Sequence, residues 1–223
     1  MKDMNTFEQF FYYLSENGLY VLSQFSQHFL TSIYGVLLAA LVGIPIGILI
    51  AKYSKISSFV ISIANIIQTI PALAMLAILM LGMGLGRTTV IVAVFLYSLL
   101  PIIKNTYTGI TNINRDLIDA GKGMGMTRSQ VLRMIELPLS LSVIIGGIRI
   151  ALVVAIGVTA IGAFIGAGGL GDIIIRGTNA TNGTAIILAG AIPTALMAVV
   201  ADIILSLIER KLDPMKRQQK QAA

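Results

Sequence analysis

Few residues in this sequence are suited to covalent or metal chemistry. The chain has no cysteine, which excludes disulfides, thiolate metal sites and cysteine nucleophiles. Its single histidine, His28, stands at the edge of a long apolar stretch, where an interfacial role is more common than a ligand or proton-relay role. The sequence also lacks the clustered acids and histidines of a membrane enzyme. We therefore expect no catalytic residue, no metal site and no cofactor bound by this chain.

Polar residues inside apolar stretches are the next candidates for chemistry, because such residues commonly mark transport pathways. Pro71 follows the polar pair Gln68-Thr69, and a proline kink there would shape a passage between helices. Asp202 is the only acid inside such a stretch, and Arg149 is its candidate partner. A carrier driven by protons or sodium usually needs more buried acids. Our candidates for the lining of a passage are Gln68, Thr69, Pro71, Thr159 and Arg149.

The longest polar connection, residues 105–140, carries a pattern of a different kind. Thr127 and Gln130 form a capping box, which predicts the start of a short helix. The run 121–125, with a glycine at every second position, predicts a tight turn before this helix, and Leu137-Pro138 predicts its end. A compact, basic and half-apolar docking surface follows from this pattern. Its apolar stripe at helical spacing consists of Val131, Met134 and Ile135.

The elements that must position these residues are membrane-spanning helices. Hydrophobic residues make up 56% of the chain and charged residues only 12%, about half the charged fraction of an average soluble domain. The charges leave apolar gaps close to the roughly 20 residues that cross a bilayer as a helix. Small residues four apart, such as Ala39, Gly43 and Gly47, predict close helix contacts. We predict an all-α polytopic membrane protein with five transmembrane helices, at about 28–51, 57–82, 88–104, 141–163 and 185–207.

Basic residues predict the orientation of these spans. If the connections alternate between the two sides of the membrane, one side receives twelve basic residues and the other three. Because positively charged connections stay in the cytoplasm, the N-terminus is expected outside and the C-terminus inside. Because the basic residues stand beside apolar spans, this rule also explains the net charge of +6, and binding to nucleic acid is not needed to explain it. The twelve are Lys52, Lys55, Lys104, Arg115, Lys122, Arg128, Arg133, Arg210, Lys211, Lys216, Arg217 and Lys220, and the three are Lys2, Arg87 and Arg176.

Residues 1–27 are predicted to form a separate amphipathic segment. They hold Asp3, Glu8 and Glu16, which disfavour a span, together with seven of the fifteen aromatic residues of the chain. This pattern predicts a helix lying in the outer interface of the membrane, and it differs from a signal peptide. We therefore divide the chain into an interfacial segment at 1–27, a transmembrane domain at 28–208 and a basic cytoplasmic tail at 209–223.

The 105–140 connection resembles the cytoplasmic loop of permeases of ATP-binding-cassette importers. The signature of that family reads E-A-A, three residues, G, nine residues and I-x-L-P, and the spacing matches throughout. There are two departures from the signature: Asp119 stands in place of its Glu, and Gly121 stands in place of its second Ala. The resemblance implies a coupling helix that docks in a groove on an ATPase subunit. The residues at the signature positions are Asp119, Ala120, Gly121, Gly125, Ile135, Leu137 and Pro138.

Two further segments, Leu100–Ile110 and Ala163–Asp172, resemble the osmoprotectant branch of these permeases, although the second is also similar to methionine-importer permeases. The resemblance covers about residues 30–212 and implies the type I importer core in a bacterial plasma membrane. The glycine-rich part of the second segment fits G-x-G-x-x-G but lacks the preceding strand of a dinucleotide site. It is instead a candidate external gate, at Gly168, Gly169 and Gly171.

The resemblance thus predicts a permease that imports quaternary amines, such as carnitine, glycine betaine and choline, by alternating access. It implies three partners, namely an ABC ATPase subunit that binds Mg-ATP, a second permease subunit and an extracytoplasmic solute-binding protein. A permease for methionine or another amino acid is the alternative within this class. A secondary transporter or channel, which would need no ATPase, is the alternative from another class.

Overall fold

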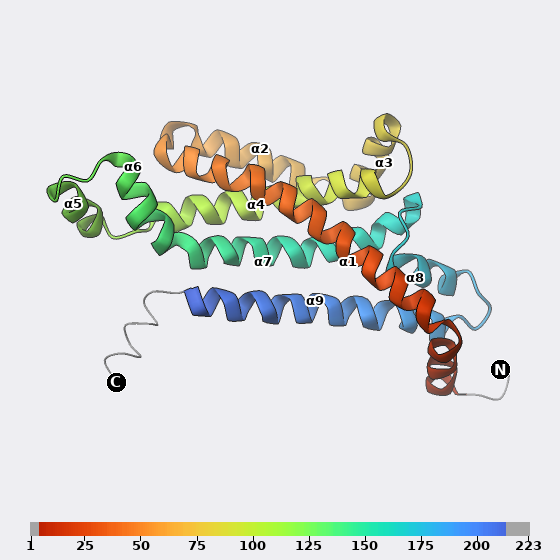
Figure 1. Ribbon diagram of the computed structural model, residues 1–223. Helices are drawn as coiled ribbons and strands as arrows, with labels where there is room; N and C mark the ends of the chain where they lie inside the picture. The colour runs from red at the N-terminus through yellow and green to blue at the C-terminus, as the bar shows by residue number, and fades with distance from the viewer. Residues whose placement is uncertain (1–4, 213–223) are drawn as a thin grey trace, which may run out of the picture.

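The protein is a bundle of long helices (Figure 1). In the computed structural model, which describes residues 5–212, α1 (Thr6–Lys52), α4 (Arg87–Thr111), α7 (Leu137–Ile161) and α9 (Thr184–Leu212) belong to helices long and apolar enough to cross a membrane. A fifth candidate span is the bent pair α2 (Ser57–Thr69) and α3 (Ala72–Met83). The described residues contain no strand, which agrees with the predicted all-α class. Residues 213–223 of the predicted tail at 209–223 lie outside the described part of the chain. The short elements are η1 (Ser54–Ile56), α5 (Arg115–Gly123), α6 (Arg128–Val131), η2 (Leu132–Glu136), η3 (Gly162–Ile165) and α8 (Leu170–Thr178).

The second predicted span, 57–82, is broken rather than continuous. α2 ends at Thr69, α3 begins at Ala72, and the two helices are bent by 95°. Ile70 has an extended backbone, as the residue before a proline prefers, and Pro71 occupies the N-cap position of α3. The freed carbonyl of Ile70 accepts a hydrogen bond from the hydroxyl of Tyr97 in α4. The predicted kink at Pro71 is confirmed, and the predicted span 57–82 is a bent pair of helices rather than one continuous helix.

α1 runs without interruption through the predicted boundary between residues 27 and 28. It begins with a capping box between Asn5 and Glu8, and its one position with non-helical backbone angles is Asn17. Figure 1 shows the first turns of α1 directed away from the rest of the helix. A separate helix before residue 28 is not formed, and the division into an interfacial segment at 1–27 and a span from residue 28 stays a prediction. No proline or glycine stands there to end a helix, whereas Asn17-Gly18 pairs two weak helix formers.

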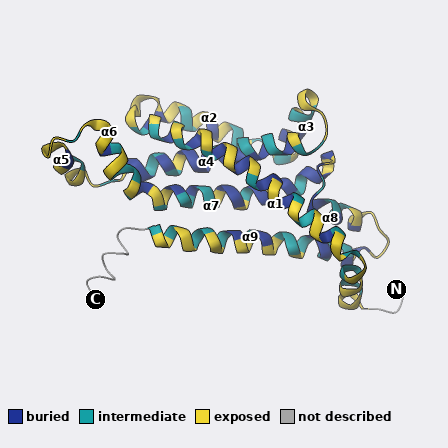
Figure 2. Ribbon diagram, in the orientation of Figure 1, coloured by how far each residue is buried: buried dark blue, intermediate teal, exposed yellow. Residues whose placement is uncertain are grey.

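α1, α4 and α7 form the most closely packed part of the bundle (Figure 2). Glycines of α1 allow its backbone to approach α4. A Cβ atom at Gly43 would lie 3.0 Å from Ile102, and one at Gly47 would lie 2.5 Å from Thr106. Ala39, one turn earlier, is fully buried. The close contacts predicted from the small residues are confirmed, and they fix α1 to α4.

α9 packs against α7 and α8 but leaves a continuous apolar face exposed (Figure 2). In a membrane such a face contacts lipid or another subunit rather than water. The exposed residues of this face are Leu196, Val199, Val200, Ile203, Ile204 and Leu207.

Candidate coupling loop and pathway residues

The coupling loop, residues 115–136, forms a compact unit at one end of the bundle (Figure 1). α5 is capped by Asn114, whose side chain accepts a hydrogen bond from the backbone N–H of Asp116 in the first turn. It ends in a Schellman motif, in which the Met126 N–H donates to the Gly121 carbonyl at 3.1 Å and the Gly125 N–H donates to the Lys122 carbonyl at 2.9 Å. Gly125 adopts the left-handed conformation that this motif requires, with φ of 83°. These local bonds fix the turn at the tip of the loop.

α6 begins with the predicted capping box. The Thr127 side chain accepts from the backbone N–H of Gln130, and the Gln130 side chain accepts from that of Thr127. The prediction that Leu137-Pro138 ends this helix is wrong, because the chain passes through the π-helical turn η2 and continues as α7. Pro138 lies in the first turn of α7. A proline lacks an N–H and crowds the preceding turn, and the wider π-helical turn accommodates both effects.

Two positions of the importer signature meet inside the coupling loop. A Cβ atom at Gly121 would lie 2.6 Å from the Cδ1 atom of Ile135 and 3.1 Å from the sulfur of Met126. Glycine in place of the second Ala of the signature therefore lets α5 pack closely on η2. Gly121 serves packing and Gly125 serves the turn, while Gly123 has open space around it and no left-handed backbone. The predicted turn thus depends on one of the three glycines.

The outer surface of the coupling loop combines exposed apolar and charged side chains. Met124, at the tip, is 76% exposed, and Leu117 and Met134 are also exposed. Asp119 and Lys122 form an ion pair at 2.9 Å on the exposed side of α5. Apolar side chains exposed on a polar loop mark an interaction surface. Of the remaining signature residues, Ala120 and Pro138 are exposed and Leu137 is half-buried at the start of α7.

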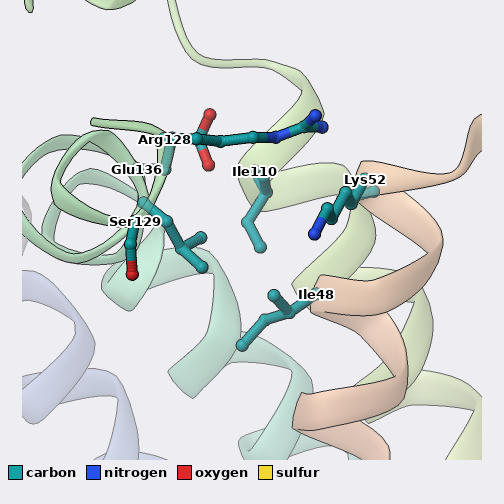
Figure 3. Close-up of a pocket in the computed structure, with 8 residues that line it drawn as sticks. Ile48, Lys52, Ile110, Arg128, Ser129 and Glu136 are labelled. Atoms are coloured by element: carbon teal, nitrogen blue, oxygen red, sulfur yellow. The ribbon is translucent and has the colours of Figure 1, made fainter. Parts of the chain in front are cut away.

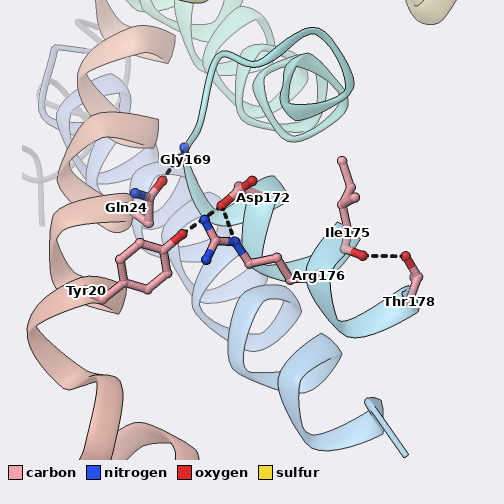
Figure 4. Close-up of polar contacts among 7 residues, drawn as sticks. All are labelled: Tyr20, Gln24, Gly169, Asp172, Ile175, Arg176 and Thr178. Carbon is pink, nitrogen blue, oxygen red and sulfur yellow. Dashed lines mark hydrogen bonds and ion pairs between the residues drawn. The ribbon is translucent and has the colours of Figure 1, made fainter. Parts of the chain in front are cut away.

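The candidate gate lies at the other end of the bundle in the gate segment, residues 162–178, which comprises η3, a glycine-rich turn and α8. Its turn is fixed to α1 (Figure 4). The Gly169 N–H donates to the Gln24 side chain at 2.6 Å. The Gln27 side chain donates to the Ala167 carbonyl at 2.8 Å. Gly168 and Gly169 have positive φ angles of 70° and 79°. The turn is therefore tightly packed, and its role as a gate stays a prediction.

α8 is joined to α1 by a polar cluster (Figure 4). The Tyr20 hydroxyl donates to the Asp172 carboxylate at 2.7 Å, and the same carboxylate oxygen pairs with Arg176 at 2.7 Å. The Arg176 guanidinium also lies 5.0 Å from the centre of the Tyr20 ring, a cation–π contact. Gly171 packs so closely on α7 that a Cβ atom there would overlap with the Ala160 carbonyl. The sequence analysis did not identify Tyr20 or Gln24, because their partners stand about 150 positions away in the chain.

The five candidates for the lining of a passage are not brought together. Gln68, Thr69 and Pro71 lie at the break between α2 and α3. Thr159 is buried between α7 and α1, where its hydroxyl accepts from the Ser32 hydroxyl at 2.9 Å. A role in a passage stays a prediction for all of them, and within the described chain Thr159 serves contact between helices.

Arg149 joins α7 to α9. Its guanidinium pairs with Asp202 at 3.1 Å and with Glu209 at 2.7 Å, and all three side chains are partly exposed. The predicted partnership with Asp202 is confirmed. Glu209 was missed because it follows the predicted end of the last span at 207, although seven residues, or two helical turns, place it on the same face as Asp202.

Comparison with known proteins decides the family. Residues 43–214 match the profile of the binding-protein-dependent transport system inner membrane component. The chain belongs to this family. As the sequence predicted, it is therefore a multi-pass inner-membrane permease component of a transport system.

Several permeases of this family are similar to the chain over nearly its whole length. It is 65% identical to the glycine betaine/carnitine/choline transport system permease protein OpuCD of Bacillus subtilis, over 97% of this chain and 94% of that protein. It is 64% identical to the carnitine transport permease protein OpuCD of Listeria monocytogenes, over 97% of each chain. A solved structure of the MetNI methionine ABC transporter shares the fold, with a TM-score of 0.78 at 22% identity, over 86% of this chain and 95% of that one. This structural similarity confirms the type I importer fold.

Proposed function

We propose that this permease lines the passage of an ATP-driven importer for quaternary amines such as glycine betaine, carnitine and choline. The observation that carries the proposal is the 63–65% identity to three permeases named for these solutes, over 97% of this chain. The similarity to the methionine transporter concerns the fold alone, at 22% identity. Quaternary amines are therefore favoured over methionine, and family membership disfavours a secondary transporter or channel.

The proposed machine contains partners that supply energy and substrate. An ABC ATPase subunit binds and hydrolyses Mg-ATP and docks on the coupling loop, where Met124 and Leu117 are exposed. A second permease subunit completes the passage, and an extracytoplasmic solute-binding protein delivers the amine. The coupling loop faces the cytoplasm, the N-terminus lies outside and the C-terminus inside. The permease itself binds no ATP and catalyses no bond cleavage.

The continuity of one helix suggests how the motion of an ATPase reaches the far side of the membrane. α6, η2, α7 and η3 follow one another without a break from Arg128 to Ile165, 38 residues, and the chain changes direction between α6 and α7 (Figure 1). One end of this helical segment lies in the coupling loop, and the other enters the gate segment. Because no loop interrupts the segment, a displacement of the coupling loop is passed along α7 to the gate segment, which is the behaviour that alternating access needs.

Uptake and subunit capture test this function together. The chain is expressed with its genomic neighbours in cells that lack quaternary-amine uptake, and transport of labelled glycine betaine, carnitine, choline and methionine is measured. We expect amine uptake, together with an ATPase subunit that co-purifies with the tagged permease. Gly125→Trp should abolish both, whereas Gly82→Trp, also placed in open space, should preserve both. Uptake of methionine without uptake of any amine would overturn the proposed substrate class. If Gly125→Trp keeps both amine uptake and the co-purifying ATPase subunit, the proposed docking site is wrong.

The absence of cysteine from the sequence allows a clean test of orientation. Met124→Cys places a single thiol at the tip of the coupling loop, and Thr181→Cys places one in the exposed turn before α9. In intact cells a membrane-impermeant maleimide should label position 181 and leave position 124 unlabelled until the cells are opened. The reverse pattern would contradict the proposed orientation.

A further inference from the structure

A pocket of about 360 Å³ lies between the coupling loop and the ends of two spans (Figure 3). Lys52 reaches it from the last turn of α1, and Arg128 reaches it from α6 on the other side. The pocket has the size of a small-molecule site. Its apolar lining consists of Ile48, Ala51, Ile110 and Leu132, and its other polar residues are Ser129 and Glu136.

The charged residues of this pocket have no ionic partner among the described residues. Among residues 5–212, the ion pairs within 4.0 Å involve other charged residues, and Lys52 makes a cation–π contact with the ring of Tyr53 at 5.3 Å. With two cations and one carboxylate, the lining carries a net charge of +1. Two basic side chains directed at one cavity, neither of them paired with its single carboxylate, favour an anionic ligand.

The position of the pocket identifies the kind of anion. Its walls are the final turns of α1 and α4 on one side and α6 with η2 on the other, so it opens between the loop and the membrane spans. The tip of the loop around Met124, where we place the ATPase, does not line it. Basic pockets between helices at the cytoplasmic surface bind anionic lipid headgroups, and Tyr53 is of the residue type that marks this interface.

We propose that this pocket binds one anionic phospholipid of the cytoplasmic leaflet. Lys52 and Arg128 hold the phosphate, Glu136 accepts a hydrogen bond from a headgroup hydroxyl, and the start of an acyl chain lies on Ile48, Ile110 and Leu132. The leaflet rests on the orientation proposed above, whereas the site itself does not depend on the transported solute. A lipid bound here joins the first span to the coupling loop.

The test uses the transporter purified with its partner subunits in nanodiscs of phosphatidylglycerol and phosphatidylcholine in equal amounts. After extraction into mild detergent, native mass spectrometry counts the lipids that remain on the permease. The test variant is Lys52→Gln/Arg128→Gln. The control, Lys55→Gln/Arg133→Gln, removes two exposed charges outside the pocket. Each basic residue at an anionic surface contributes about a fivefold gain in affinity, so the test variant should retain phosphatidylglycerol about 30-fold less well than the native chain.

A second variant, Ile48→Trp, fills the apolar floor without changing the charge and should also expel the lipid. Equal retention of phosphatidylglycerol by native chain, control and both test variants would overturn the proposal. Retention of phosphatidylcholine by the native chain as strong as that of phosphatidylglycerol would also overturn it. Displacement of the bound lipid by inorganic phosphate alone would overturn it too, because it would indicate a simple anion site. Loss of the ATPase subunit from the test variant with unchanged lipid retention would assign the pocket to the partner protein instead. None of these outcomes depends on amine uptake, which tests the proposed function separately.

Discussion

The coupling loop and the gate segment are both glycine-rich connections next to α7, yet they are held in opposite ways. The coupling loop is closed by its own bonds, namely the Schellman motif at Gly125 and the capping box at Thr127. The gate segment is held by α1, through Gln24, Gln27 and Tyr20. A loop that folds by itself leaves its outer surface free to bind another subunit. A segment bonded to a neighbouring helix changes position only when those bonds break or both elements move together.

The largest expected effect in this comparison is at Gly171 in the gate segment. In Gly171→Val the new side chain would overlap with the backbone carbonyl of Ala160, which no rotamer change can relieve. We expect a cost of about 3 kcal/mol or more and loss of folded permease, measured by size-exclusion chromatography after heating. The control is Gly157→Val, at an exposed position of α7 with open space around it. Equal heat resistance of the two variants would show that the gate segment is not tightly packed.

Gly121 in the coupling loop should give a smaller and more local effect. In Gly121→Val the neighbour is the flexible end of Ile135, so the loop loses about 1–3 kcal/mol while the spans stay intact. We expect an unchanged melting temperature of the bundle and amine uptake lowered about tenfold, which corresponds to 1.4 kcal/mol of lost docking. Gly123→Val, in open space on the same loop, is the control. If both variants transport equally well, packing inside the loop does not govern coupling.

Tyr20→Phe should destabilise the junction between α1 and α8 by about 1.5–3 kcal/mol, because it removes a hydrogen bond to a charged carboxylate. The measurement is the melting temperature in detergent, with the exposed Tyr12→Phe as the control. A double-mutant cycle with Asp172→Asn isolates the interaction. Additive effects of the two substitutions would show that this contact does not hold the gate segment.

The smallest effect on stability should come from the Asp119–Lys122 pair of the coupling loop. Both side chains are exposed, so breaking the pair should cost under about 0.5 kcal/mol and leave the melting temperature unchanged. Amine uptake should nevertheless fall more in Asp119→Asn than in Lys122→Gln, because position 119 carries the acid of the importer signature. Equal uptake by the two variants would mean that the acid has no contact of its own with the ATPase.

The coupling loop was the more predictable of the two regions because its signals are short-range. The capping box at Thr127 and the turn at Gly125 involve residues within five positions of one another, and both formed as expected. The one prediction for this region that is wrong concerns where its second helix ends. Leu137-Pro138 predicts a helix end, but the π-helical turn carries the helix through Pro138, and nothing in the local sequence marks that turn.

The contacts of the gate segment were beyond prediction from sequence for a physical reason. Gln24, Gln27 and Tyr20 bond to partners 140 to 152 residues away, and one sequence does not reveal which distant elements meet. The acids in residues 1–27 predict a separate helix, yet α1 is continuous. Acids in the first turns require only that those turns lie outside the bilayer, which a single long helix also allows.

Site-directed photocrosslinking tests the central claim, that the coupling loop docks an ATPase subunit, most directly. A benzophenone attached to Met124→Cys would probe the tip of the coupling loop, and one attached to Thr181→Cys would probe the turn at the other end of the bundle. On illumination of the assembled transporter in membranes, we predict a covalent adduct with the ATPase subunit from position 124 and none from position 181. An adduct from neither position, or from position 181 alone, would contradict this account of the loop.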